Sequence, residues 1–192
     1  SVTSSPAVLT VTPPSNTAPV FTAPIFGTNF AINVGVNLAV ACPATDSDLP
    51  AQTLTYSLLT GPPGAAVDSG TGNFTWRPGV SSAGSVNNIS VVVTDNGTPN
   101  LSATNSFTVT VNSLSAPAAG TSAYAGGQFS VSVSGQVGPD YALQASTNLA
   151  GGGWTTVAVT NSPASVPFIL TDTNAAAQPM QFYRIVTGPP LP

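Results

Sequence analysis

Few side chains in this chain can take part in acid–base, nucleophilic or metal chemistry. The ionisable set is six Asp, two Arg, four Tyr and Cys42, and there is no Lys, Glu or His. Serine and cysteine hydrolases need a general base that this set lacks, and zinc sites need His or several Cys. A glycosidase-type carboxylate pair would have to use two Asp, and Asp46 and Asp48 share one short loop. We therefore expect the protein not to be an enzyme.

The composition restricts the partners that the chain can have. Of its 192 residues, 42% are hydrophobic and only 4% are charged, whereas about a quarter of a typical soluble domain is charged. Two Arg cannot neutralise the phosphates that nucleic-acid binding requires. No run of about 20 apolar residues is present, so we expect no membrane span. A surface of uncharged polar residues suits a protein held in place by neighbouring subunits or glycans.

The single cysteine limits the possible cross-links, and the asparagine sequons indicate the cellular location. Cys42 is the one cysteine, so no internal disulfide is possible. It is in phase with Leu38 and Val40, and we expect a small core residue rather than a cross-link to another chain. Four sequons offer possible N-glycosylation sites and favour an extracellular or cell-surface location; their acceptors are Asn73, Asn88, Asn96 and Asn100.

Alternating apolar residues indicate strands along most of the chain. Between Phe30 and Cys42 every even position is apolar, which predicts two strands, or one strand bent at Gly35. Four further segments repeat this period of two, and Gly, Pro, Asn and Asp separate them. About seven short strands in about 100 residues are typical of a β-sandwich. No segment has a capped helical period, so we expect almost no helix.

Residues 1–15 contain a single strand pattern with nothing obvious to pair with. The predicted assembly strand comprises Val8, Leu9, Thr10, Val11 and Thr12 within the segment 7–12. Leu9 and Val11 fall on one face, and two prolines follow, which cannot continue a ladder. The segment either packs on its own chain or completes a sheet in a neighbouring subunit. Because the chain starts within this pattern, we expect it to be a processed or fragmentary product.

Six runs of sequence stand out in the segment 16–112: ATDSD (44–48), LTYSL (54–58), GPPGA (61–65), TGNFTWRP (71–78), VVTDNGTP (92–99) and FTVTV (107–111). With these runs the segment resembles the cadherin-like and immunoglobulin-like repeats of large bacterial surface proteins. The resemblance covers about half of the chain and implies an antiparallel β-sandwich.

The same resemblance implies a possible calcium site. Cadherin-type repeats hold calcium with carboxylate oxygens, and Asp46, Asp48, Asp95 and Asn16 fall at the corresponding positions. The linker here lacks the expected acidic cluster, and the Glu-bearing motifs are missing because the chain has no Glu. The alternative is that the three aspartates cap turns through their side chains. No other cofactor is expected.

A second β-module is predicted after a soft linker over residues 113–127. Its strands are expected near 129–133, 141–145, 154–159, 166–170 and 182–186. The runs YALQASTN (141–148), GWTT (153–156) and QFYRIV (181–186) resemble a small C-terminal β-domain of secreted bacterial proteins. The predicted fold is thus all-β, with an orphan strand (1–15) and two tandem immunoglobulin-like or cadherin-like sandwiches (16–112 and 113–192).

Most aromatic residues are in phase with core positions. Trp154 follows three glycines and is the aromatic side chain most open to a sugar-stacking role. Arg184 alternates with Phe182 and Val186, which places it beside a sheet edge or in a pair with an aspartate such as Asp172.

These observations favour a structural subunit of an extracellular bacterial filament, surface layer or adhesin stalk. Identical subunits would assemble by β-strand addition into a homo-polymer, with glycans as possible further partners. The alternatives are a carbohydrate-binding or adhesive accessory module of a larger secreted protein, and a passive spacer. A binding module would behave as a monomer and lose polysaccharide binding on Trp154→Ala.

Overall fold

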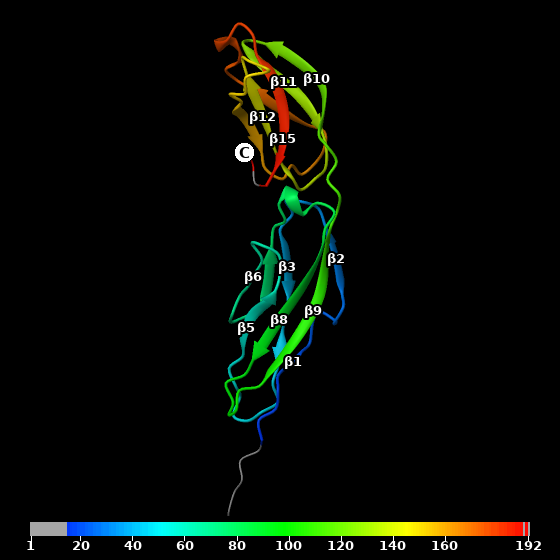
Figure 1. The fold of residues 1–192 in the computed structure, drawn as a ribbon, viewed down its shortest axis with the longest axis vertical. Coiled ribbons are helices and arrows are strands. Elements are labelled where there is room, and N and C mark those ends of the chain that lie inside the picture. The colour runs from blue at the N-terminus through cyan, green and yellow to red at the C-terminus, as the bar shows by residue number, and fades with distance from the viewer. Residues whose placement is uncertain (1–14, 190, 192) are drawn as a thin grey trace, which may run out of the picture.

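The computed structural model consists of two β-sandwiches arranged end to end (Figure 1). It describes residues 15–189 and 191. The predicted all-β tandem architecture is confirmed: apart from two short 3-10 turns, Val80–Ser82 and Ala175–Ala177, the described elements are strands. No helix in this described part of the chain is long and apolar enough to cross a membrane.

The N-terminal sandwich is built from strands β1 to β9. One sheet has the order β2-β9-β8-β5, the opposite sheet has the order β3-β7-β6, and β1 pairs with β4. The pairs are antiparallel except that β2 runs parallel to β9. The strands are β1 (Val20–Phe21), β2 (Asn29–Ile32), β3 (Leu38–Ala41), β4 (Ala44–Thr45), β5 (Thr55–Thr60), β6 (Ala66–Val67), β7 (Asn73–Trp76), β8 (Val86–Thr94) and β9 (Ser102–Val111).

Alternation along the strands produces the core of this sandwich. On β8 and β9 every second residue points between the sheets, and Val91, Val93 and Val109 have no exposed surface. Phe107 lies edge-on to Phe74 across the sheets, with ring centroids 5.4 Å apart. The packing of alternate side chains from both sheets therefore accounts for the core that the sequence pattern predicted.

The long apolar alternation before Cys42 forms two strands rather than one. The chain turns at Gly35 (φ +76°), so β2 joins one sheet and β3 the other. Glycine adopts this backbone conformation without the steric cost that a Cβ would impose. Cys42 lies in the core with no exposed surface, as expected, and burial raises the pKa of its thiol to about 11.

The C-terminal sandwich packs two three-stranded sheets, β10-β11-β14 and β13-β12-β15. Its core contains Val131, Val133, Tyr141, Leu143 and Leu170. The strands are β10 (Ala118–Ala125), β11 (Gln128–Ser134), β12 (Asp140–Ser146), β13 (Thr155–Thr160), β14 (Phe168–Asp172) and β15 (Phe182–Gly188).

The soft linker predicted over residues 113–127 is wrong for most of its length. Strand β10 occupies Ala118–Ala125 and pairs with β11 in antiparallel register. All eight residues of this strand are exposed, and its sequence, AAGTSAYA, accordingly shows no apolar alternation. A strand with neither face buried leaves no period-two signal for a sequence reading to find.

Candidate functional site

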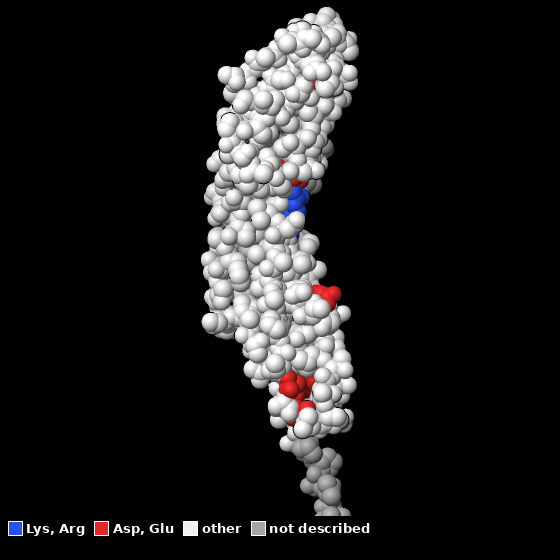
Figure 2. All heavy atoms as spheres, turned by 180° about the vertical axis from the view of Figure 1, so that it is seen from behind, with Lys and Arg blue, Asp and Glu red and all other residues white. Residues whose placement is uncertain are grey.

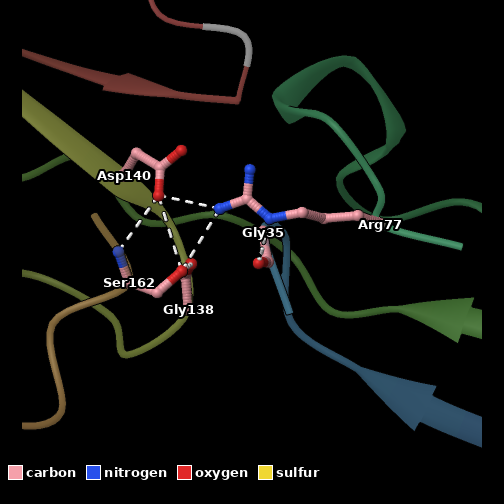
Figure 3. Close-up of polar contacts among 5 residues, drawn as sticks. All are labelled: Gly35, Arg77, Gly138, Asp140 and Ser162. Atoms are coloured by element: carbon pink, nitrogen blue, oxygen red, sulfur yellow. Dashed lines mark hydrogen bonds and ion pairs between the residues drawn. The ribbon is translucent and has the colours of Figure 1, made fainter. Parts of the chain in front are cut away.

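The two sandwiches are joined through Arg77, which follows β7 in the N-terminal sandwich. Its Nη2 donates to Asp140 Oδ1 at 2.8 Å and to Ser162 Oγ at 3.2 Å, both in the C-terminal sandwich (Figure 3). Its Nε donates to the Gly35 carbonyl at 2.8 Å. The guanidinium therefore connects a turn of its own sandwich with a carboxylate and a hydroxyl of the other. Such charge-assisted hydrogen bonds are stronger than neutral ones.

Asp140 is held in place from its own side of the junction. The Asp140 residue is buried, and its Oδ1 also accepts the Ser162 backbone N–H at 3.0 Å. Ser162 adopts a positive φ of 41°, which is uncommon for a non-glycine residue, and its Oγ donates to the Gly138 carbonyl at 2.9 Å. These contacts orient the carboxylate before it meets Arg77, so the partner is pre-positioned.

Two glycines allow the backbones of the sandwiches to approach closely. A Cβ on Gly35 would collide with the Gly138 carbonyl oxygen, and a Cβ on Gly138 would lie 2.8 Å from the Val34 carbonyl oxygen. Both residues have positive φ, +76° and +118°. Side chains larger than hydrogen at these two positions are incompatible with the observed contact.

Further contacts on either side of Arg77 extend this junction. Val34, whose carbonyl oxygen lies beside Gly138, is 1% exposed and belongs to the core of the N-terminal sandwich. Asn33 Nδ2 donates to the Val137 carbonyl at 3.0 Å, and the Val80 N–H donates to the Pro189 carbonyl at 2.8 Å. Hydrogen bonds thus join the sandwiches at several separate points, which opposes bending between them.

Sequence reasoning missed this junction. Arg77 is one of only two cations in the chain, and that rarity was the one available signal. Asp140 lies 63 positions away, and no local pattern relates the two residues. The close approach of Gly35 and Gly138 depends on how the two sandwiches dock, which local sequence does not specify.

The predicted calcium residues come together at the opposite end of the N-terminal sandwich. We call Asn16, Asp46, Asp48, Gln52 and Asp95 the acidic pole; its carboxylates form the red group near the lower end in Figure 2. Asn16 Nδ2 donates to Asp95 Oδ2 at 3.0 Å, and Gln52 Nε2 donates to both Asn16 Oδ1 and Asp48 Oδ2. Gln52 was not predicted, and it connects the other members.

Hydrogen bonds within the acidic pole satisfy most of the carboxylate oxygens. Asp95 is 2% exposed, and burial opposes its ionisation, but N–H donors from Leu101, Gly97 and Asn16 outweigh burial and hold its pKa below the usual value. Asp46 Oδ1 accepts the Asp48 N–H at 2.9 Å, and Asp95 Oδ1 accepts the Gly97 N–H at 2.9 Å. These are the turn-capping bonds expected of aspartates in such loops.

Two buried oxygens of the acidic pole have no hydrogen-bond donor. They are Asp46 Oδ2 and Gln52 Oε1. A buried acceptor without a partner is unfavourable, and oxygen atoms of this kind are the ligands that calcium prefers. A hollow of about 140 Å³ is lined by Asn16, Asp48 and Gln52, but not by Asp46. Within the described residues, however, no group of three or more Asp, Glu, His or Cys lies close enough to share a metal. A cation would therefore depend on amide and backbone oxygens as well.

The remaining predicted sites lie apart from both clusters. All four sequon asparagines are exposed; Asn100 Nδ2, the atom that would carry a glycan, donates to the Asp95 carbonyl at 2.8 Å. The predicted assembly strand, residues 8–12, lies outside the described residues.

The alternative sugar-stacking residue Trp154 has an arginine over its ring. The Arg184 guanidinium carbon lies 4.5 Å from the ring centroid. Arg184 Nε donates to Gln144 Oε1 at 2.8 Å, so the suggested pair with Asp172 is wrong. Asp172 instead accepts from the Tyr183 hydroxyl at 3.0 Å. One face of the indole is thus occupied by the protein itself.

Comparisons with known proteins find similarity only to solved structures. A comparison with family models finds no match, and a comparison with curated proteins finds none. A nucleoside hydrolase-related hypothetical protein from Saccharophagus degradans, described as associated with carbohydrate metabolism, is 20% identical over 51% of this chain, with a TM-score of 0.43. The protocadherin GammaB4 extracellular domain is 18% identical over 67% of the chain, with a TM-score of 0.41. Protocadherin gammaB7 EC3-6 is 17% identical over 89% of the chain, with a TM-score of 0.41.

This chain spans only part of those three proteins. It covers 26%, 26% and 51% of their respective lengths. None of these likenesses bears on what this chain binds or assembles with.

Replacing Gly35 by Ala tests the close approach at the junction. Gly64 has a similar positive φ of +80° but has nothing within 4 Å of an added Cβ, so Gly64→Ala is a matched control. We expect Gly64→Ala to cost about 1–2 kcal/mol of unfolding free energy through backbone strain. Gly35→Ala should cost about 1–3 kcal/mol more, because its methyl group is forced against the Gly138 carbonyl. Urea unfolding measures both values, and equal losses would contradict the assignment.

Proposed function

We propose that the chain is a structural module of an extracellular bacterial filament, surface layer or adhesin stalk. The observation that carries this proposal is the junction, in which Arg77 binds Gly35 in one sandwich and Asp140 and Ser162 in the other. A module that bears load or sets a spacing needs its domains fixed relative to one another, and interfaces between domains otherwise permit relative motion.

The surface chemistry supports the same proposal. Apart from one red patch, the face shown in Figure 2 is uncharged between the acidic pole and the junction. Uncharged polar surfaces repel one another weakly, so they favour close association with copies or glycans over dispersal in solution. A non-catalytic role also agrees with a chain that has no His, Lys or Glu. The carbohydrate-binding alternative is less well supported, because Arg184 covers one face of Trp154.

Arg77→Ala should let the two sandwiches, which together form a rod, bend relative to one another. Losing a half-exposed charged hydrogen-bonding group costs about 1–2 kcal/mol, and the two sandwiches should then sample a range of angles. Small-angle scattering should show a broader distribution of interatomic distances for Arg77→Ala than for the wild type. Arg184→Ala is the matched control, because it removes the other arginine without touching the junction. An unchanged scattering profile for Arg77→Ala would contradict the claim that this junction fixes the orientation of the two sandwiches.

Assembly by strand addition is the finer part of the proposal. The segment 7–12 alternates apolar and polar residues, with Leu9 and Val11 on one face. Added to a sheet edge of another copy, it would form main-chain hydrogen bonds and place those two side chains in apolar pockets.

Deleting residues 1–12 should therefore abolish assembly and leave a folded monomer. Circular dichroism and melting temperature should match those of the full chain, because the core clusters of the described residues are built from positions outside this segment. Light scattering and electron microscopy measure the assembly. Filaments that form equally well without residues 1–12 would rule out the strand-donor role.

A bound calcium ion at the acidic pole is a further part of the proposal. Asp46 Oδ2 and Gln52 Oε1 would supply two of its ligands, and Asp48 would supply negative charge. The ion would neutralise carboxylates and satisfy the two buried oxygens, so it would stabilise the N-terminal end of the rod.

Calcium at millimolar concentration should raise the melting temperature of the chain relative to chelator, since a ligand that binds only the folded state stabilises it. Asp46→Asn should reduce that increase, whereas Asp68→Asn, which removes a carboxylate from a different turn, should leave it unchanged. A melting temperature independent of calcium would count against the site.

A further inference from the structure

The C-terminal sandwich is closed along one side and open along the other. On the closed side β13 lies against β14, which joins the two sheets. On the other side the sheets end in β10 and β15, each of which pairs with one described strand only. A groove of about 210 Å³ runs between these terminal strands. Its lining is mostly apolar and includes Phe129, Val131, Leu143 and Ile185, together with Ser122 from β10 and the charged Arg184 from β15.

The floor of this groove belongs to the core of the sandwich. Val131 and Leu143 are core residues, and Phe129 and Ile185 pack against them. Val131 and Leu143 are themselves only 5% and 1% exposed, so the apolar surface that solvent reaches in the groove comes from the partly buried Phe129 and Ile185. Apolar surface of this kind gains stability when another apolar group displaces the water.

The edge of β10 beside the groove lacks most of the usual protection. Exposed edge strands commonly carry charged residues or proline, which prevent pairing with other chains. Strand β10 (AAGTSAYA) has neither, and its eight residues are all exposed. Its only irregularity is a register shift between Ala119 and Ser122 on the side that faces β11.

We propose that residues 7–12 of a second copy of this chain add to the free edge of β10, with Leu9 and Val11 seated in the groove. This inference rests on the proposed function and names its acceptor site. In a strand, residues two apart share a face, so Leu9 and Val11 point inward together while Thr10 and Thr12 face solvent. A dry cavity of about 150 Å³ admits a benzene molecule, so a groove of about 210 Å³ has room for branched aliphatic side chains.

The segment of the same copy cannot reach this groove. Asn16 donates to the Pro99 carbonyl at 2.9 Å, which places the start of the described chain beside the loop that precedes β9. Strand β10 begins beyond the other end of β9 (Figure 1). The ten residues of β9 span about 33 Å at ~3.3 Å per residue, whereas residues 13–15 span at most about 11 Å.

The occupant must therefore come from another copy, and the contact is head-to-tail. The donor leaves from the N-terminal end of one rod and the acceptor lies in the C-terminal sandwich of the next. A contact between two different surfaces does not close on itself in a pair, so it propagates into a linear or ring-shaped assembly.

Disulfide trapping in the full chain tests the acceptor. In the double variant Val11→Cys with Ser122→Cys, neighbouring copies should cross-link and give a ladder of multimers on a non-reducing gel. The native Cys42 does not compete, because it is buried and its pKa is raised to about 11. The control pairs Val11→Cys with Thr104→Cys, an exposed position beside a second apolar hollow on β9. A ladder with Thr104→Cys but not with Ser122→Cys would overturn the proposal.

A matched pair of arginine substitutions gives a second readout. Ser122→Arg places a long side chain and a second positive charge in the groove, in addition to that of Arg184, whereas Ala123→Arg places them on the opposite face of β10. We expect Ser122→Arg to weaken assembly at least tenfold and Ala123→Arg to leave it nearly unchanged, with similar melting temperatures. If the wild type assembles but neither the ladder nor the Ser122→Arg effect is seen, the acceptor is elsewhere and the proposed function stands. If the wild type remains monomeric and no ladder forms, both proposals fail.

Discussion

The contact of Arg77 with Asp140 is the interaction on which the arrangement of this molecule depends. It is the one salt bridge within the described residues, and its side chains are 32% and 9% exposed. Ion pairs at protein surfaces contribute little when water and other charges compete for them. Here hardly any other charge is present, and the Asp140 side chain is largely buried. The close approach at Gly35 and Gly138 brings the two sandwiches together at this same ion pair.

The negative charge of the carboxylates is compensated by different groups at the two ends of the N-terminal sandwich. At the junction, Asp140 is compensated by a cation. At the acidic pole, Asp48 and Asp95 are compensated by backbone and amide N–H groups, which disperse the charge without a counter-ion. The second solution leaves two oxygens without donors. That deficit distinguishes the pole from a set of ordinary turn caps and is the physical basis for considering a cation there.

The low charge of the chain also connects its two unusual surfaces. Natural sheet edges are commonly protected by lysine, and this chain has none. An unprotected edge such as β10 is a hazard for a freely diffusing protein, but it is useful for a subunit whose edges are covered after assembly. The open groove beside β10 and the rigid junction would then serve one purpose, since strand addition transmits force along the rod only if the two sandwiches do not bend apart.

The sequence alone determined the class of fold, most of the strands and the core, because alternation of apolar residues is a local property that survives in any β-sandwich. Phe74, Val91 and Cys42 are buried where the pattern placed them. It also offered turn capping as one of two readings of the aspartates, and Asp46 and Asp95 make such bonds, which span two residues. Strand β10 was missed because neither of its faces is buried.

Only the tertiary structure decided that β2 and β3 belong to different sheets, that Gln52 joins the acidic pole, and that Arg77 meets Asp140. Each of these contacts joins residues that lie far apart in sequence or sit on opposite sides of a turn, and their geometry is set by how the sheets and sandwiches dock rather than by any local pattern.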